Sequence, residues 1–206
     1  GARAMPVREM ELEWLAGDES FLYRIAKRLC NTFRAVLGTE GKSGRGLRLA
    51  ERPAHFSPME TLPSARPDQT PGETALNAFR VLLTRISMGR VRFCLHPEEP
   101  DHLHDIRVDL RRLRSLIALL KPCLAAGQHR SLRRAVYRMV RPTASLREAD
   151  MLADAWHRHC RSTLGSLPAP VRIGKRIAGQ REACAKQTLR DLNRVRWSRA
   201  LLTLSI

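Results

Sequence analysis

The apolar and polar side chains at the start of the chain alternate with a period of two. Between Glu9 and Trp14, glutamates alternate with Met10, Leu12 and Trp14, and Gly17 follows shortly after. Successive side chains of a β-strand point to opposite faces, so this alternation is the pattern of a half-buried strand. The sequence therefore predicts a strand that ends before Gly17.

The next segment has the period of a helix. From Glu19 to about Phe33, apolar residues recur every three or four positions, with basic residues on the other side. This spacing predicts a short amphipathic helix. A glycine-rich turn then leads to a second short strand candidate at residues 47–49.

Prolines divide the chain into two parts. Four prolines lie between residues 52 and 69. Proline lacks a backbone N–H and fixes φ, so this stretch can neither continue a helix nor enter a central strand. We expect a short α/β segment at residues 1–52, a linker at 53–69 and a helical domain at 70–206.

Helical spacing dominates after the linker. Thr70, Pro71 and Glu73 stand as N-cap, N1 and N3 of a capping box, which predicts a helix from residue 71 to about Leu95. Prolines then delimit the helices that follow. The further expected helices cover residues 101–121, with Asp101 as cap and Pro122 as stop, 128–141, with Pro142 as stop, 145–161, and 170–204, with a kink at Gly179.

The fold class predicted from these elements is mainly α, an antiparallel helical bundle with a short α/β segment before it. A chain of 206 residues can bury a core, and 43% of the residues are hydrophobic while only 5% are aromatic. Aliphatic side chains and alanine should therefore build that core, as in packed helices. The tryptophans are expected to anchor the core or an interface.

The net charge indicates an anionic partner. The 37 Lys and Arg residues exceed the 20 Asp and Glu residues by 17. Such an excess attracts RNA, DNA, an anionic membrane and polyphosphate alike. Most of the cations are arginines, whose planar fork grips phosphate oxygens in pairs, so phosphate ligands are favoured. No apolar run is long enough to cross a bilayer, and five scattered cysteines fit a reducing cytosol better than a disulfide framework.

Two stripes run along the segment from Asp101 to Lys121. The first stripe is apolar and predicts a seam that faces a core; its members are Leu103, Ile106, Leu110, Leu113, Ile117 and Leu120. The second is basic and has the same spacing, displaced by one residue or about 100° around the helix; its members are His104, Arg107, Arg111 and Arg114. Like charges at this spacing repel one another, and the basic stripe contains no acid.

Later helices repeat this arrangement of basic residues. Residues 128–141 place Arg130, Arg134, Arg138 and Arg141 on one face, and the last helix adds further arginines and lysines. Antiparallel packing through short loops would bring several such rows to one groove. An extended chain of phosphates would relieve the repulsion among them.

Two motifs resemble those of a known family. The stretch from His104 to Arg114, HDIRVDLRRLR, resembles the pattern H-x-x-R-V-x-x-R-R-L-R of the conserved-histidine alpha-helical domain, the CHAD family. Leu146 to Leu152, LREADML, is similar to that family's second motif, with Glu148 and Met151 departing from it. The resemblance covers residues 70–206 and corresponds to the first of the family's two helical bundles.

The CHAD resemblance implies an all-helical fold around a basic cavity that binds inorganic polyphosphate. By position it implies roles for His104, Arg107, Arg111, Arg112 and Arg114, and from the second motif for Arg147. Because only the first bundle is matched, a second copy of the chain is a candidate for supplying the other half of the cavity.

The N-terminal segment resembles part of another family. Residues 9–18 and 42–49 are similar to the closing strand and trailing segment of a CYTH, or triphosphate tunnel, domain. That resemblance implies a divalent metal on acidic strand residues, with Glu9 and Glu11 at the matching positions. The opening Glu-x-Glu-x-Lys strand is not found, so we expect no triphosphatase activity from this chain.

The function expected from the sequence is therefore binding of inorganic polyphosphate by a cytoplasmic module, in association with polyphosphate granules, with no catalysis, cofactor, metal or membrane contact. The expected binding residues are His104, Arg107, Arg111, Arg112, Arg114, Arg134, Arg138 and Arg147. The alternatives are an RNA-binding basic protein, against which the few aromatics count, and a fragment of a metal-dependent triphosphatase.

Simpler interpretations exist for several of these residues. The basic row could be a solvated helix face. Arg147 and Asp150, three residues apart, could form an intrahelical ion pair, and this is the interpretation we favour for Asp150. His157 and His159 lie near Asp154, but two residues apart they point to different sides of a helix, which disfavours a metal site.

Overall fold

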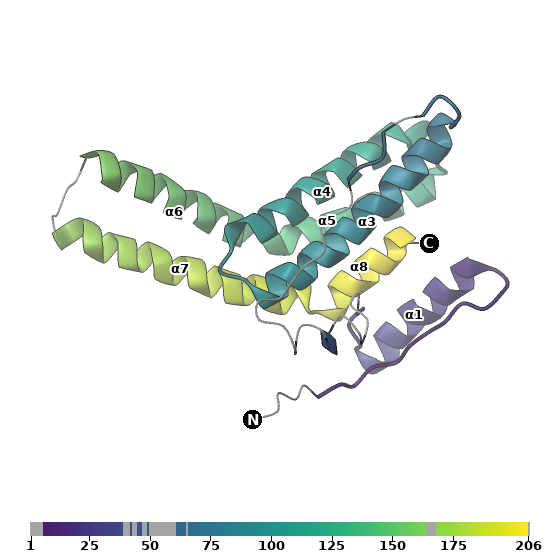
Figure 1. Cartoon of the computed structure of the whole chain (residues 1–206), viewed down its shortest axis with the longest axis horizontal. Helices are drawn as coiled ribbons and strands as arrows, with labels where there is room; N and C mark the ends of the chain where they lie inside the picture. The colour runs from purple at the N-terminus through teal and green to yellow at the C-terminus, as the bar shows by residue number, and fades with distance from the viewer. Residues whose placement is uncertain are drawn as a thin grey trace.

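The computed structural model describes residues 6–38, 42, 45–46, 49, 61–64, 66–163 and 168–205, and helices account for most of them (Figure 1). The helices with assigned bounds are α1 (Glu19–Phe33), α3 (Pro71–Leu95), α4 (Pro100–Leu119), α5 (Ala126–Val140), α6 (Ala144–Thr163), α7 (Pro168–Leu192) and α8 (Val195–Ser205). Two short 3₁₀ turns, Lys121–Cys123 and Arg141–Thr143, join α4 to α5 and α5 to α6. The mainly α fold predicted from the sequence is confirmed.

The predicted N-terminal strand is wrong. None of the described residues lies in a strand, and Met10, Leu12 and Trp14 are 53%, 41% and 52% exposed. An alternating segment forms a strand only where a neighbouring strand takes its hydrogen bonds and a core takes its apolar face, and these side chains face solvent instead. Of the second candidate, residues 47 and 48 lie outside the described residues, and Leu49 is helical.

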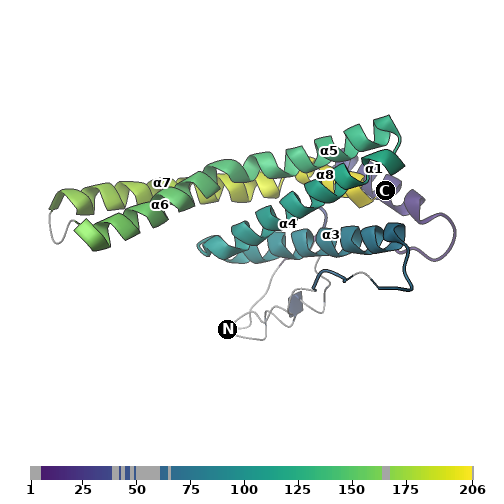
Figure 2. The same ribbon diagram turned by 90° about the horizontal axis from the view of Figure 1, so that it is seen from above.

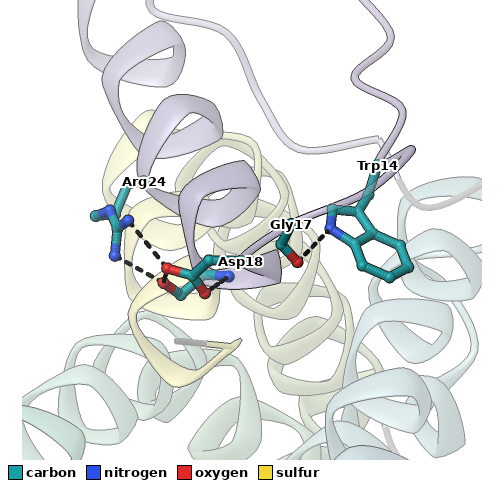
Figure 3. Close-up of polar contacts among 5 residues, drawn as sticks. Trp14, Gly17, Asp18 and Arg24 are labelled. Atoms are coloured by element: carbon teal, nitrogen blue, oxygen red, sulfur yellow. Dashed lines mark hydrogen bonds and ion pairs between the residues drawn. The ribbon is translucent and has the colours of Figure 1, made fainter.

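The predicted helix from Glu19 to Phe33 is confirmed as α1, and local hydrogen bonds define its start (Figure 3). Asp18 is the N-cap, and its carboxylate accepts from the Ser20 backbone N–H at 2.9 Å and from Arg24 Nη2 at 3.3 Å. These hydrogen bonds lower the pKa of Asp18, those from Ser20 contributing most. Before the helix, Trp14 Nε1 donates to the Gly17 carbonyl at 3.2 Å.

The capping box predicted at Thr70 is confirmed. Thr70 Oγ1 accepts from the Glu73 N–H at 3.2 Å, and the Glu73 carboxylate accepts from the Thr70 N–H at 2.8 Å. Helix α3 then packs closely against α4. A Cβ atom at Gly89 would lie 2.8 Å from Cγ1 of Ile106, so only glycine allows this approach of the two helices.

The start of α4 differs from the prediction. Glu99, not Asp101, is the N-cap residue, and Pro100 occupies the first turn. Proline is favoured there because that N–H has no helical partner, so Pro100 begins this helix instead of only ending the one before it. The predicted apolar seam is confirmed over most of its length, since Leu103, Ile106, Leu110, Leu113 and Ile117 are all at most 1% exposed.

The last predicted helix is two helices. Helix α7 runs through Gly179 without a break and ends at Leu192, and α8 begins at Val195 after a turn at Asn193 and Arg194. The break lets α8 turn back onto the bundle, where its Trp197 and Leu201 are buried. Asn193 holds the turn against α3, since its side-chain amide lies 3.5 Å from Cys94 Sγ.

The helices form a bundle with an arm. Helices α3, α4, α5 and α8 pack together, and α1 lies against α8. Helices α6 and α7 pack on each other and extend beyond the bundle as a long two-helix arm (Figures 1 and 2). The core is built from apolar side chains of α3, α4, α5 and α8, with Leu146 and Leu192 closing it at the base of the arm.

Replacement of Gly89 by alanine should destabilise the protein. The new methyl group would overlap Ile106, and overpacking of this kind costs about 1–3 kcal/mol. Gly179 is a matched control, because it also lies inside a long helix but has open space around its Cβ position. Gly179→Ala should stabilise by about 0.5–1 kcal/mol through helix propensity alone. Urea denaturation followed by circular dichroism measures both, and an equal effect of the two substitutions would contradict the close packing.

Candidate anion-binding site

Arg107 has a fixed position between α4 and the turn that leads into α6. Its Nη1 donates to Thr143 Oγ1 at 2.7 Å, and the Thr143 hydroxyl donates to the Val140 carbonyl at 2.7 Å. Thr143 is fully buried, while Arg107 is only half-buried. The guanidinium is thus anchored at one nitrogen, and its other donors are left for a ligand.

Two further arginines lie near Arg107. Burial lowers the pKa of Arg107, and the positive charges of Arg147 and Arg111 lower it further, while Glu148 opposes this. Helices α4 and α6 are in contact, and Arg147 of the second motif therefore lies near the α4 row. Among the described residues, none of these three arginines forms an ion pair with a carboxylate. We call Arg107, Arg111 and Arg147 the arginine cluster.

Arg114 continues the α4 row beyond the arginine cluster. It is exposed and lines a hollow of about 420 Å³ near the end of α4. Three basic residues that sequence reasoning did not place in the site line the same hollow, namely Lys121, His129 and Arg133. His104, at the other end of the row, is exposed and forms no hydrogen bond or ion pair with a described residue.

Arg112 does not join the arginine cluster. Its Nη1 donates to Asp109 Oδ1 at 3.1 Å, and Asp109 Oδ2 accepts from Arg85 Nε of α3 at 2.9 Å. Asp109 is 1% exposed, so this carboxylate is buried between two guanidiniums. One residue along a helix is a rotation of about 100°, which turns Arg112 away from the row that contains Arg111.

Arg134 and Arg138 lie on another face. They line a hollow of about 220 Å³ together with Lys27 of α1 and Arg199 of α8. No residue of the arginine cluster lines this hollow. The structure therefore divides the arginines expected at one site between two faces.

The favoured pairing of Asp150 with Arg147 is wrong. Asp150 Oδ1 accepts from Arg181 Nε of α7 at 2.8 Å, and Arg181 Nη2 also donates to the Glu98 carbonyl at 2.8 Å. Asp150 is 8% exposed and faces α7, so the nearby guanidinium on its own helix is left unpaired. Burial raises the pKa of Asp150, and the charge of Arg181 opposes that rise.

Sequence reasoning also missed a basic hollow beside α8. It measures about 630 Å³ and is lined by arginines of α5, of the turn after α5, and of α8. This hollow was missed because the break after Leu192 was not predicted. A continuous helix would have placed Arg194, Arg196 and Arg199 along the extension of α7 and not beside α5.

Within the described residues, no group of three or more His, Cys, Asp or Glu side chains is placed to hold a metal ion. Glu9 and Glu11 contact cations of the chain itself. Glu11 lies 3.1 Å from Lys42 Nζ, and Glu9 is paired with Arg45. None of the described helices is both long enough and apolar enough to cross a bilayer.

Asp150→Ala should cost about 3 kcal/mol of stability, because it leaves the largely buried Arg181 without its counter-charge. Asp154→Ala is the matched control one turn along α6. The Asp154–Arg158 pair is exposed on both sides, so its loss should change stability by less than about 0.5 kcal/mol. The denaturation midpoints of the two variants measure this difference. Similar midpoints would show that the Asp150–Arg181 ion pair does not stabilise the packing of α6 against α7.

Comparison with known proteins assigns a family to the part of the chain that contains this site. No curated protein and no solved structure matches the chain. The family model described as CHAD domain matches residues 88–206, which is more than half of the chain and includes the arginine cluster. CHAD domains are related to polyphosphate binding and are not by themselves catalytic. From the length of this match we conclude that the chain belongs to the CHAD domain family.

Proposed function

We propose that the protein binds inorganic polyphosphate and that the arginine cluster is the centre of the binding site. Arg107, Arg111 and Arg147 contact phosphate oxygens, and Arg114 continues the contact along α4. His104 donates a further hydrogen bond at the start of the row. The family's relation to polyphosphate supports this ligand over other polyanions.

The observation that carries the proposal is the placement of Arg107. Its guanidinium is half-buried and anchored to the buried Thr143 through one nitrogen, and none of the described carboxylates forms an ion pair with it. Burial lowers the pKa of this guanidinium, and the charges of Arg147 and Arg111 lower it further, so the environment disfavours its positive charge. Proteins usually place a carboxylate in such a cluster, but none of the described carboxylates pairs with these three side chains. A phosphate oxyanion supplies the missing negative charge and accepts bidentate hydrogen bonds from arginine.

The spacing of the row favours a linear anion. Arg107, Arg111 and Arg114 follow one another at about one helical turn, roughly 5 Å each. A chain of linked phosphates carries repeated negative charge along its length and can contact successive turns, releasing counterions at each one. A single phosphate would neutralise only one part of the row.

The protein acts in this proposal as a binding module without chemistry of its own. The arginines position phosphates and provide no nucleophile or general base. We include in the proposal a cytoplasmic location in association with polyphosphate granules. Incubation of tripolyphosphate with the protein and magnesium should release no phosphate.

Loss of two arginines of the cluster should weaken polyphosphate binding without weakening the fold. Arg111→Ala combined with Arg147→Ala removes both charges that lower the pKa of Arg107. We expect the affinity to fall at least tenfold and the salt dependence to flatten by roughly 0.7 per lost contact, as for single-stranded polyanions. Because repulsion is relieved, the melting temperature without ligand should stay the same or rise. Titration at several salt concentrations and thermal melting measure both.

The matched control is Arg172→Ala with Arg176→Ala. Both side chains are exposed on α7, form no ion pair with a described residue, and change the net charge by the same amount. This control should lower the affinity by no more than about twofold through the general field. Equal losses in the two double variants would show that net charge alone, and not the cluster, holds the ligand.

A further inference from the structure

We propose that a second face of the protein, formed by α5 and α8, binds single-stranded nucleic acid, with Tyr137 as the platform on which a base stacks. This face shares no residue with the arginine cluster. The inference therefore does not depend on the proposed function, and either can fail alone.

The phosphate-binding part of this face is the hollow of about 630 Å³ beside α8. The basic residues that line it are Arg138, Arg141, Arg194, Arg196 and Arg199. Among the described residues that line it, the one acidic side chain is Asp191, which already accepts from Arg194 Nη1 at 2.9 Å. The four remaining guanidiniums form no ion pair with a described carboxylate, so an anion in the hollow would meet them uncompensated.

Tyr137 gives this face an exposed aromatic ring. It is 66% exposed although it is a large apolar side chain in the middle of α5, and its hydroxyl has no hydrogen-bond partner among the described residues. It lines both the hollow beside α8 and a neighbouring hollow of about 580 Å³. Arg133 and Arg141 stand four residues before and after it, and therefore on the same side of the helix. A ring between two groups of guanidiniums can stack a base while the flanking phosphates are bound.

The aromatic ring distinguishes this face from the arginine cluster. A polyphosphate chain has no surface that could cover a tyrosine ring, whereas every nucleobase has one. The other aromatic residue in the hollow, Trp197, is 2% exposed, and Arg90 lies over its ring at 5.5 Å, so it is not available for stacking. Of the described aromatic residues in this hollow, Tyr137 is therefore the one that can stack a base and add to the binding energy.

The two faces point in different directions. Ser145 lines the hollow beside α8, and Arg147 belongs to the arginine cluster. These residues are two positions apart near the start of α6, a rotation of about 200°. An oligonucleotide on the α5 and α8 face thus leaves Arg107, Arg111 and Arg147 free. Arg133 beside Tyr137 also lines the hollow of Arg114, so the two faces adjoin at the far end of the α4 row. Because a tyrosine ring accepts any base, we expect RNA and DNA to bind with little sequence preference.

The test uses a fluorescent single-stranded oligonucleotide of about 12 nucleotides, within the usual site size of such proteins, and measures anisotropy with the full chain. Tyr137→Leu should weaken binding about tenfold, since one stacked base is lost, while Tyr137→Phe keeps the ring and should stay within about twofold of the unmodified protein. Arg138→Ala with Arg141→Ala should weaken binding and flatten its salt dependence. Phe33→Leu is the control for loss of an exposed aromatic elsewhere, at a residue that is 62% exposed, and should have no effect.

Two results would overturn the inference. One is an unchanged oligonucleotide affinity in Tyr137→Leu, which would mean that charge alone binds the oligonucleotide. The other is loss of oligonucleotide binding in Arg111→Ala with Arg147→Ala, which would place the strand on the arginine cluster. Polyphosphate affinity of Tyr137→Leu should remain within about twofold. If polyphosphate does not bind while the oligonucleotide does, the proposed function fails and this inference stands.

Discussion

The buried seam of α4 sets the direction of every other side chain on that helix. Leu103, Ile106 and Leu110 are almost completely buried, so α4 cannot rotate without exposing them. Residues one position further along lie about 100° to one side, at the edge of the core. Arg107 therefore becomes half-buried and reaches Thr143 in the 3₁₀ turn between α5 and α6. A rotation by a single residue would bury arginines in the core, which is prohibitive without partners.

The same seam separates basic residues that have different roles. On one flank of α4, Arg107 and Arg111 lie near a third positive charge, and neither forms an ion pair with a described carboxylate. On the other flank, Arg112 and Arg85 enclose the buried Asp109. Removal of either partner from such a buried pair leaves a charge without compensation, so these residues hold α3 and α4 together. Two arginines that are neighbours in the sequence therefore have different roles: Arg111 is placed to contact a ligand, and Arg112 stabilises the fold.

The sequence predicts the helices well because their periodicity and their prolines are local signals. The capping box at Thr70 and the seam of α4 depend only on residues within a few turns, and both are found where expected. The prediction of an N-terminal strand failed because a strand needs a hydrogen-bonding partner outside its own segment. The break after Leu192 was missed because no proline or glycine marks it; it is held by contacts of Asn193 with α3. Because the return of α8 onto the bundle was not predicted, Arg134 and Arg138 were expected in one groove with Arg107. In the structure they line a hollow on another face together with Arg199 of α8.

The link between the segment after α1 and the last helix constrains the order of folding. The Leu37 N–H donates to Ser198 Oγ at 3.0 Å, across 161 residues of chain, and Arg90 Nη2 donates to the Leu37 carbonyl across 53 residues. Contacts between remote positions form late because the chain entropy of closing large loops must be overcome first. The hairpins α3–α4 and α6–α7 join near neighbours and need no such closure. Because α1 packs against α8 near the other end of the chain, we expect it to dock late and to open locally while the bundle that holds the arginines stays intact.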